Sequence, residues 1–155
     1  MKKVLLLSVL MMMLCTVGNA KGIELEPRVG ASYTKHWGIH AGALASYSLS
    51  ESFYLQPGIL LHTVGGSERD QRIRNWKLGL DVPLYASFRI PLNEETKVRL
   101  NAGPYVGFLS RLCMGTAVET GVEYRKYYLG VSWFQNFVNE NCARQNFSIG
   151  YKFAL

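Results

Sequence analysis

The sequence predicts an all-β protein, an eight-stranded antiparallel up-and-down transmembrane β-barrel. Apolar and polar residues alternate with a period of two, in segments of the length that a membrane-spanning strand needs, about ten residues. Turn-forming stretches separate consecutive segments, as in strands joined in series by hairpins. The two faces of each segment also differ, because one face carries no charged residue. Together these three patterns favour a closed barrel with one face toward lipid.

The chain begins with the layout of a secretory signal peptide. Lys2 and Lys3 form a positive start, an apolar run follows over 4–17, and small residues precede Lys21. Cleavage is therefore expected after Ala20. The apolar run is too short for a transmembrane helix, which needs about 20 residues. The predicted division of the chain is a cleaved signal peptide over 1–20 and a barrel domain over 21–155.

Eight strands follow in order along the mature chain. Their predicted ranges are 23–34, 38–49, 53–63, 76–90, 97–109, 115–125, 127–136 and 145–153. Four connections are predicted to be tight, near 34–37, 48–51, 91–97 and 125–126. The stretches 64–75 and 136–146 are predicted to be long loops, and 110–115 one of intermediate length.

The charged face also carries most of the glycines that lie within strands. A strand-interior glycine costs stability and usually marks a close approach by another group. On a solvent-facing surface these glycines would serve no purpose, whereas a narrow lumen needs room for Arg, Lys and Tyr side chains. We therefore predict that the charged face lines the lumen. The glycines on this face are 30, 42, 58, 79, 103, 107, 121, 130 and 150.

Aromatic residues on the apolar face are concentrated near the two ends of the predicted strands. With the N-terminus at the periplasmic side, one group lies at the outer strand ends and another at the periplasmic ends, with aliphatic residues between them. Two aromatic girdles around an aliphatic band are typical of the two interfaces of a bilayer. The outer group is Tyr33, Trp37, Trp76, Phe108 and Trp133, and the periplasmic group is Tyr47, Phe53, Phe88, Tyr124, Tyr127, Tyr151 and Phe153.

Several segments resemble a known family. GIHAGALASYSLSESFYLQPGILL (38–61), LDVPLYASFRI (80–90), LNAGPYVGFL (100–109) and FSIGYKF (147–153) are similar to the small outer-membrane β-barrel proteins called "porin family" or PorT-like. The resemblance implies an eight-stranded outer-membrane barrel, inserted by the barrel-assembly machinery, with no shared catalytic residues. The chain departs from the family in two ways. The loop between the fifth and sixth predicted strands is short, and Ala154 and Leu155 follow the terminal aromatic residue.

The lumen face carries charges of both signs. Because the interior of an eight-stranded barrel is just wide enough for side chains, opposite charges on neighbouring strands should pair and plug it. The predicted lumen charge network is Glu24, Glu26, Arg28, Lys77, Asp81, Arg89, Arg99, Glu119, Glu123 and Lys152. This predicts a structural or surface-interaction protein that works through its external loops. The alternatives are a narrow porin-like channel and a soluble exported β-barrel that binds an apolar ligand.

The predicted external loops contain two further candidate features. Arg69, Arg72 and Arg74 lie in the long loop over 64–75, and guanidinium groups bind phosphate in a bidentate manner. This arrangement predicts contact with lipopolysaccharide phosphates, while the alternative is a loop kept soluble by its charges. Cys113 and Cys142 fall in the third and fourth external loops, where an exported protein would join them in a disulfide.

No constellation in the sequence predicts an enzyme, a cofactor or a metal site. His40 and His62 lie on the lumen face as expected hydrogen-bonded histidines, and His36 lies in the first external link. No serine shares a lipid-facing position with any of them, and no Cys/His group has zinc-binding spacing. The charge excess is modest and forms no basic run of the kind that binds nucleic acid. We expect a monomer surrounded by outer-membrane lipid.

Overall fold

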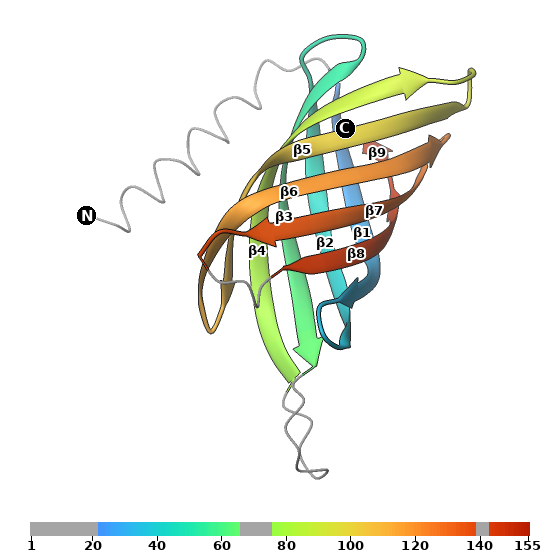
Figure 1. The fold of residues 1–155 in the computed structure, drawn as a ribbon. Coiled ribbons are helices and arrows are strands. Elements are labelled where there is room, and N and C mark those ends of the chain that lie inside the picture. The colour runs from blue at the N-terminus through green and yellow to red at the C-terminus, as the bar shows by residue number, and fades with distance from the viewer. Residues whose placement is uncertain (1–21, 66–75, 139–142) are drawn as a thin grey trace.

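The computed structural model describes residues 22–65, 76–138 and 143–155, which form strands joined by short connections (Figure 1). The predicted signal peptide lies outside the described residues and stays a prediction. The strands are β1 (Ile23–Tyr33), β2 (Trp37–Ser48), β3 (Phe53–Gly65), β4 (Trp76–Pro91), β5 (Thr96–Leu109), β6 (Arg111–Tyr124), β7 (Tyr127–Asn136), β8 (Arg144–Tyr151) and β9 (Phe153–Ala154).

The strands form one closed antiparallel barrel. Each strand from β1 to β7 pairs with the next along the chain, and β8 returns to pair with β1. Strand β9 continues β8 beyond Lys152 and pairs with the same strand, β1, so the nine segments amount to eight barrel strands. Closure leaves no open sheet edge. An open edge would expose unpaired backbone groups to the lipid, which is strongly unfavourable. The predicted fold class is confirmed.

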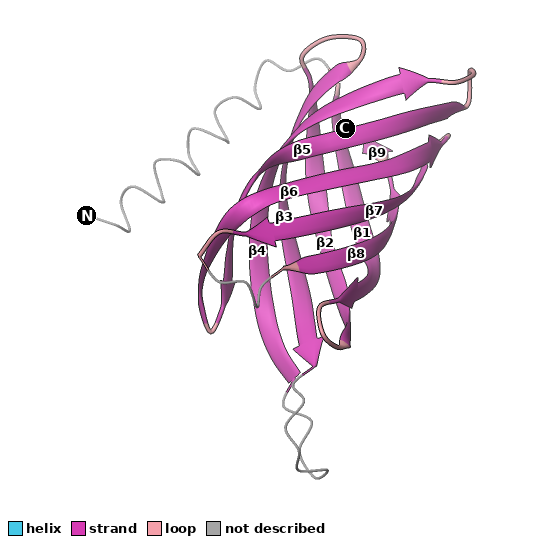
Figure 2. Cartoon of the chain, in the orientation of Figure 1, coloured by secondary structure: helices cyan, strands magenta, loops and turns pink. Residues whose placement is uncertain are grey.

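The connections differ between the two ends of the barrel (Figure 2). The β2–β3, β4–β5 and β6–β7 turns are short and lie at the same end as the start of β1 and the C-terminus. The connections that leave β1, β3, β5 and β7 lie at the other end. In transmembrane barrels the short turns are periplasmic and the longer loops extracellular, so the second end is taken as external. Within the described residues, no helix is long and apolar enough to cross a membrane.

The connection between β5 and β6 is shorter than expected. Ser110 alone separates the two strands and adopts a positive φ of 60°, and β6 begins at Arg111. The prediction of a loop over 110–115 is therefore wrong, because the alternation continues through Leu112 and Met114 on the outer face. Cys113 consequently lies within β6, opposite Gly107, with its side chain buried.

The two faces of the barrel are oriented as the glycines and aromatics predict. Most of the large exposed side chains of the strands are apolar or aromatic, including Trp37, Phe108 and Trp133 near the external end. The buried side chains are mainly polar or charged, together with a small apolar cluster of Leu44, Leu60, Tyr85, Tyr105, Ala117 and Phe134. The soluble-barrel alternative requires the opposite arrangement and is contradicted by this orientation.

The residues after the terminal aromatic join the barrel wall. Ala154 pairs with Glu24, and the amide of Leu155 donates a hydrogen bond of 2.9 Å to the Ile23 carbonyl. The final dipeptide therefore extends the closing pair of strands.

Candidate functional site: the lumen charge network

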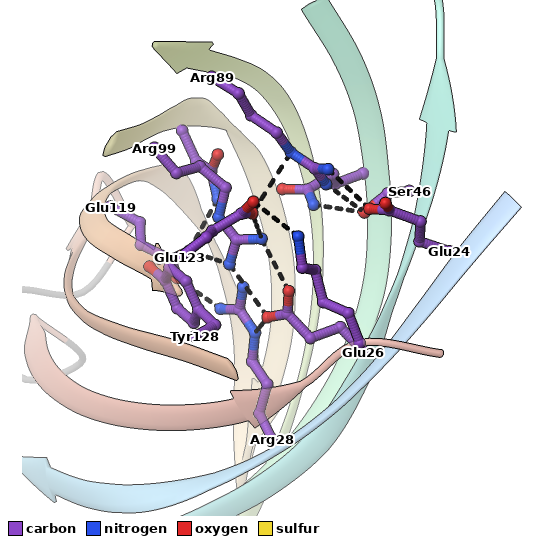
Figure 3. Close-up of polar contacts among 12 residues, drawn as sticks. Glu24, Glu26, Arg28, Ser46, Arg89, Arg99, Glu119, Glu123 and Tyr128 are labelled. Carbon is purple, nitrogen blue, oxygen red and sulfur yellow. Dashed lines mark hydrogen bonds and ion pairs between the residues drawn. The ribbon is translucent and has the colours of Figure 1, made fainter. Parts of the chain in front are cut away.

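Eight charged residues meet inside the half of the barrel that contains the start of β1 and the C-terminus (Figure 3). They lie on alternate positions of four strands and at the junction of β8 and β9, so that each side chain points into the lumen. Four are acidic and four are basic, which balances their formal charge. This group, the lumen charge network, consists of Glu24, Glu26 and Arg28 of β1, Arg89 of β4, Arg99 of β5, Glu119 and Glu123 of β6, and Lys152.

Arg99 occupies the centre of the network and is fully buried. Its guanidinium donates hydrogen bonds of 2.7 and 3.0 Å to Glu26 and one of 2.8 Å to Glu123. The guanidinium carbon also lies 3.6 Å from the centre of the Tyr128 ring, within range of a cation–π interaction. Arg99 therefore hydrogen-bonds two carboxylates at once, and it also lies 3.6 Å from the carboxylate of Glu119.

Arg28 and Tyr128 continue the network toward Glu119. Arg28 donates to Glu26 at 2.7 Å and to Glu119 at 2.6 Å. Glu119 also accepts hydrogen bonds from the Tyr128 hydroxyl at 2.8 Å and from Asn101 at 2.7 Å. Buried carboxylates are tolerated when their lone pairs are occupied in this way. Tyr128 and Asn101 are uncharged partners of the network that sequence reasoning missed, although both occupy lumen-facing positions.

The network reaches the periplasmic mouth through Arg89 and Lys152. Arg89 contacts Glu24 at 2.6 Å and Glu123 at 3.4 Å, and Lys152 contacts Glu123 at 2.7 Å. Arg89 also stacks over the ring of Tyr54, with 3.8 Å between guanidinium carbon and ring centre. Glu24 is the most exposed of the four carboxylates, with 29% of its side chain accessible.

Some of the lumen glycines make room for lumen side chains, while others adjoin the backbone of a neighbouring strand. A Cβ added to Gly121 or Gly130 would collide with the ring or hydroxyl of Tyr128. Tyr128 is held in place by Glu119 and the two stacked guanidinium groups, so it has little freedom to move aside. The interpretation of the glycines as space for lumen side chains agrees with this geometry.

A second polar group lies toward the external mouth. Asp81 pairs with Arg144 and lies 3.1 Å from the imidazole of His62. His40 lies 2.9 Å from the hydroxyl of Ser148. Both histidines are buried in the lumen, each beside a polar partner. Sequence reasoning missed Arg144 because the predicted strand began one residue later, although Asn146, Ser148 and Gly150 mark the same face.

Two predicted network members are placed elsewhere. Lys77 is exposed near the external end of β4, and it makes no ion pair with the described residues. Asp81 belongs to the external group rather than to the central network, because its partners are Arg144 and His62. The prediction for Lys77 is wrong because alternation determines which face of the sheet a side chain is on, but not its position along the barrel axis.

Other candidates lie partly outside the described residues. Arg69, Arg72 and Arg74 fall in the undescribed stretch 66–75, and Cys142 falls in 139–142. The disulfide between Cys113 and Cys142 therefore stays a prediction, although Cys113 lies in a strand rather than in a loop. His36 is exposed in the 34–36 connection, as expected. Among the described residues, no group of three or more His, Cys, Asp or Glu side chains is arranged to hold a metal ion.

Paired charges and a small apolar cluster fill the described part of the lumen. The hollow beside Asp81 and Arg144 has a volume of about 10 Å³, room for about one water molecule. These features define the class of protein: a small transmembrane β-barrel whose interior is occupied by buried ion pairs.

Comparison with solved structures gives the same fold. The N-terminal β-barrel domain of Pseudomonas aeruginosa OprF matches with a TM-score of 0.62 and 9% identity, over 88% of this chain and 98% of that one. Neisserial surface protein A (NspA) matches with a TM-score of 0.64 and 12% identity, over 84% and 94%. Ail of Yersinia pestis in a phospholipid bilayer nanodisc matches with a TM-score of 0.53 and 12% identity, over 84% and 99%.

These low identities mean that the likeness concerns the fold. No protein-family model matches the chain, and no curated protein sequence matches it. The small outer-membrane-type barrel is therefore established as a fold, and the finer resemblance to the porin or PorT-like family stays a prediction.

Proposed function

We propose that this protein is an integral outer-membrane barrel that does not conduct solutes and acts through its external loops, in a structural or surface-interaction role. The observation that carries the proposal is the lumen charge network, in which four carboxylates and four basic groups occupy the interior. A passage for solutes would require many of these buried pairs to separate, and each unpaired buried charge is costly. The working surface is then the external end.

The location in the outer membrane is supported by the outward apolar face and the predicted signal peptide. Exposed aliphatic residues such as Ile59, Val118 and Leu129 would be unfavourable in water but suit a hydrocarbon environment. We further propose insertion by the barrel-assembly machinery and a monomeric state, in keeping with the family that the sequence resembles. None of the three compared proteins is described as an enzyme, and the proposal assigns no catalytic role.

The long loop between β3 and β4 is proposed to contact lipopolysaccharide. Arg69, Arg72 and Arg74 provide three guanidinium groups within six residues, and guanidinium binds phosphate in a planar, bidentate manner. Binding through these residues should disappear when the phosphates of the lipopolysaccharide are removed.

Single-channel recording tests the non-conducting state. Purified folded protein, inserted in a planar lipid bilayer at neutral pH, should give no steady current, while a large-pore porin treated in the same way provides the positive control. Protease protection of the inserted barrel confirms that silence reflects a closed lumen and not failed insertion. A steady ohmic current from the wild-type protein would contradict the plug and support the narrow-channel alternative.

A further inference from the structure

An aromatic notch lies on the outer surface near the external end of the barrel. Strand β8 runs between β7 and β1 (Figure 1), and three outward-facing residues lie side by side across these strands. Trp133 of β7 is opposite Gln145 of β8, which is in turn opposite Tyr33 of β1. The surface hollow at this place has a volume of about 200 Å³ and is lined by these three residues with Thr34, Ala143 and Arg144.

The walls of the notch are held apart by the sheet. Adjacent strands lie about 4.8 Å apart, so two rings on β7 and β1 are separated at their backbones by about 10 Å. Trp133 is 52% exposed and Tyr33 is 40% exposed. Tyr33 is braced on its far side by Trp37, with 5.2 Å between ring centres. Tyr33 and Trp133 therefore stand one strand to either side of Gln145, and all three line the same hollow.

Gln145 forms the floor of the notch and is an unusual residue for a lipid-facing position. Its neighbours along the outer face of β8 are Phe147 and Ile149, both exposed and apolar. The Gln145 side chain makes no hydrogen bond with any of the described residues, and it is only partly buried. Two donors and one acceptor are thus presented between two aromatic walls.

The described residues that line the notch offer no free charge of the kind that a phosphate would require. Arg144 contributes to its lining, but its guanidinium turns into the lumen, where it pairs with Asp81 and donates to Asn146 at 2.9 Å. Aromatic faces instead attract the weakly positive C–H groups of a sugar ring, and an amide bonds its hydroxyls. The chemistry of this site is therefore that of a neutral saccharide.

We infer that the notch formed by Tyr33, Trp133 and Gln145 binds a sugar ring of a glycolipid in the outer leaflet. The site continues the lipid-facing surface at the height of the external interface, where a glycolipid places its saccharide. This inference rests on the proposed outer-membrane location, but it names a different site and a different chemistry from the arginines of the β3–β4 loop. An aromatic girdle that serves only as an anchor would require neither the amide nor the hollow.

The test is a titration of the purified, folded protein in dodecylphosphocholine micelles, a detergent without sugar. The probe is rough lipopolysaccharide freed of its phosphates, and binding is followed by tryptophan fluorescence. Gln145→Leu and Tyr33→Leu should each weaken binding on the order of tenfold, or about 1.4 kcal/mol. The matched control is Tyr127→Leu, which removes an exposed aromatic residue of β7 at the periplasmic end and should leave binding unchanged.

The outcomes separate the notch from the other sources of affinity. Replacing Arg69, Arg72 and Arg74 by glutamine should weaken binding of intact lipopolysaccharide and leave binding of the dephosphorylated form unchanged. Equal losses in Tyr127→Leu and Tyr33→Leu would show general anchoring and overturn the inference, as would wild-type affinity in Gln145→Leu. A folded barrel migrates faster on a denaturing gel before boiling than after it. If the wild-type protein shows this shift but does not bind the dephosphorylated glycolipid, the saccharide site at the notch is refuted and the membrane barrel is not. A wild-type protein without that shift refutes the proposed membrane barrel.

Discussion

Replacing Arg99 by leucine should lower the free energy of unfolding of the barrel by about 3–5 kcal/mol, the cost of breaking a buried ion pair on one side. Arg99 is fully buried and bonds both Glu26 and Glu123, so its loss leaves two carboxylates without their central partner. Urea unfolding of the protein refolded into lipid vesicles, followed by tryptophan fluorescence, measures the difference.

A second substitution checks the origin of this effect. Adding Glu26→Gln to Arg99→Leu removes one uncompensated negative charge, so it should restore part of the lost stability. The surface control is Arg125→Ala, which breaks the pair between Arg125 and Glu95 in the periplasmic turns. The hydrogen bond from Arg125 lowers the pKa of Glu95, but both side chains are well exposed, so water can replace the contact. Arg125→Ala should therefore change the free energy of unfolding much less than Arg99→Leu does. A loss in Arg125→Ala as large as that in Arg99→Leu would contradict the assigned role of burial.

Replacing Val118 by arginine should destabilise the membrane-inserted barrel by about 2–4 kcal/mol, because a charge would then face the middle of the bilayer. Val118 lies at the centre of β6 with its side chain outward and 57% exposed. The same vesicle unfolding experiment measures the change.

The depth dependence provides the control for this prediction. Leu112 lies on the same face of β6 near its external end, and Leu112→Arg should cost only about 0–1 kcal/mol, because the charge reaches the interface. Equal costs at the two positions would mean that the outer face of β6 does not span a bilayer.

Alternation was sufficient to predict most of the fold. A period of two fixes which side chains share a face, and a barrel uses that rule along every strand. The charged positions of β1, β5 and β6 therefore fell on the lumen side, and the paired Glu26, Arg99 and Glu123 could be anticipated as a group. The turn at Ser110 was missed because its single residue carries no Gly or Pro signal, and this error moved Cys113 from a strand into a loop.

Height and partner choice are less accessible to sequence reasoning. Lys77 and Asp81 lie on the same face of β4, yet one is exposed at the rim and the other pairs with Arg144, which no local pattern marks. The stagger between strands determines which side chains meet across the lumen, and it depends on the closure of the whole barrel. The notch of Tyr33, Gln145 and Trp133 depends on the same non-local register.

The most direct test of a closed transmembrane barrel is its heat modifiability. The protein from purified membranes is run on a denaturing gel with and without boiling. A closed, detergent-resistant barrel predicts a fast-migrating unboiled band that shifts to the position of the unfolded chain on boiling. Recovery of the protein in the soluble fraction, with no shift on boiling, would contradict the inward placement of the charged face and with it the membrane barrel.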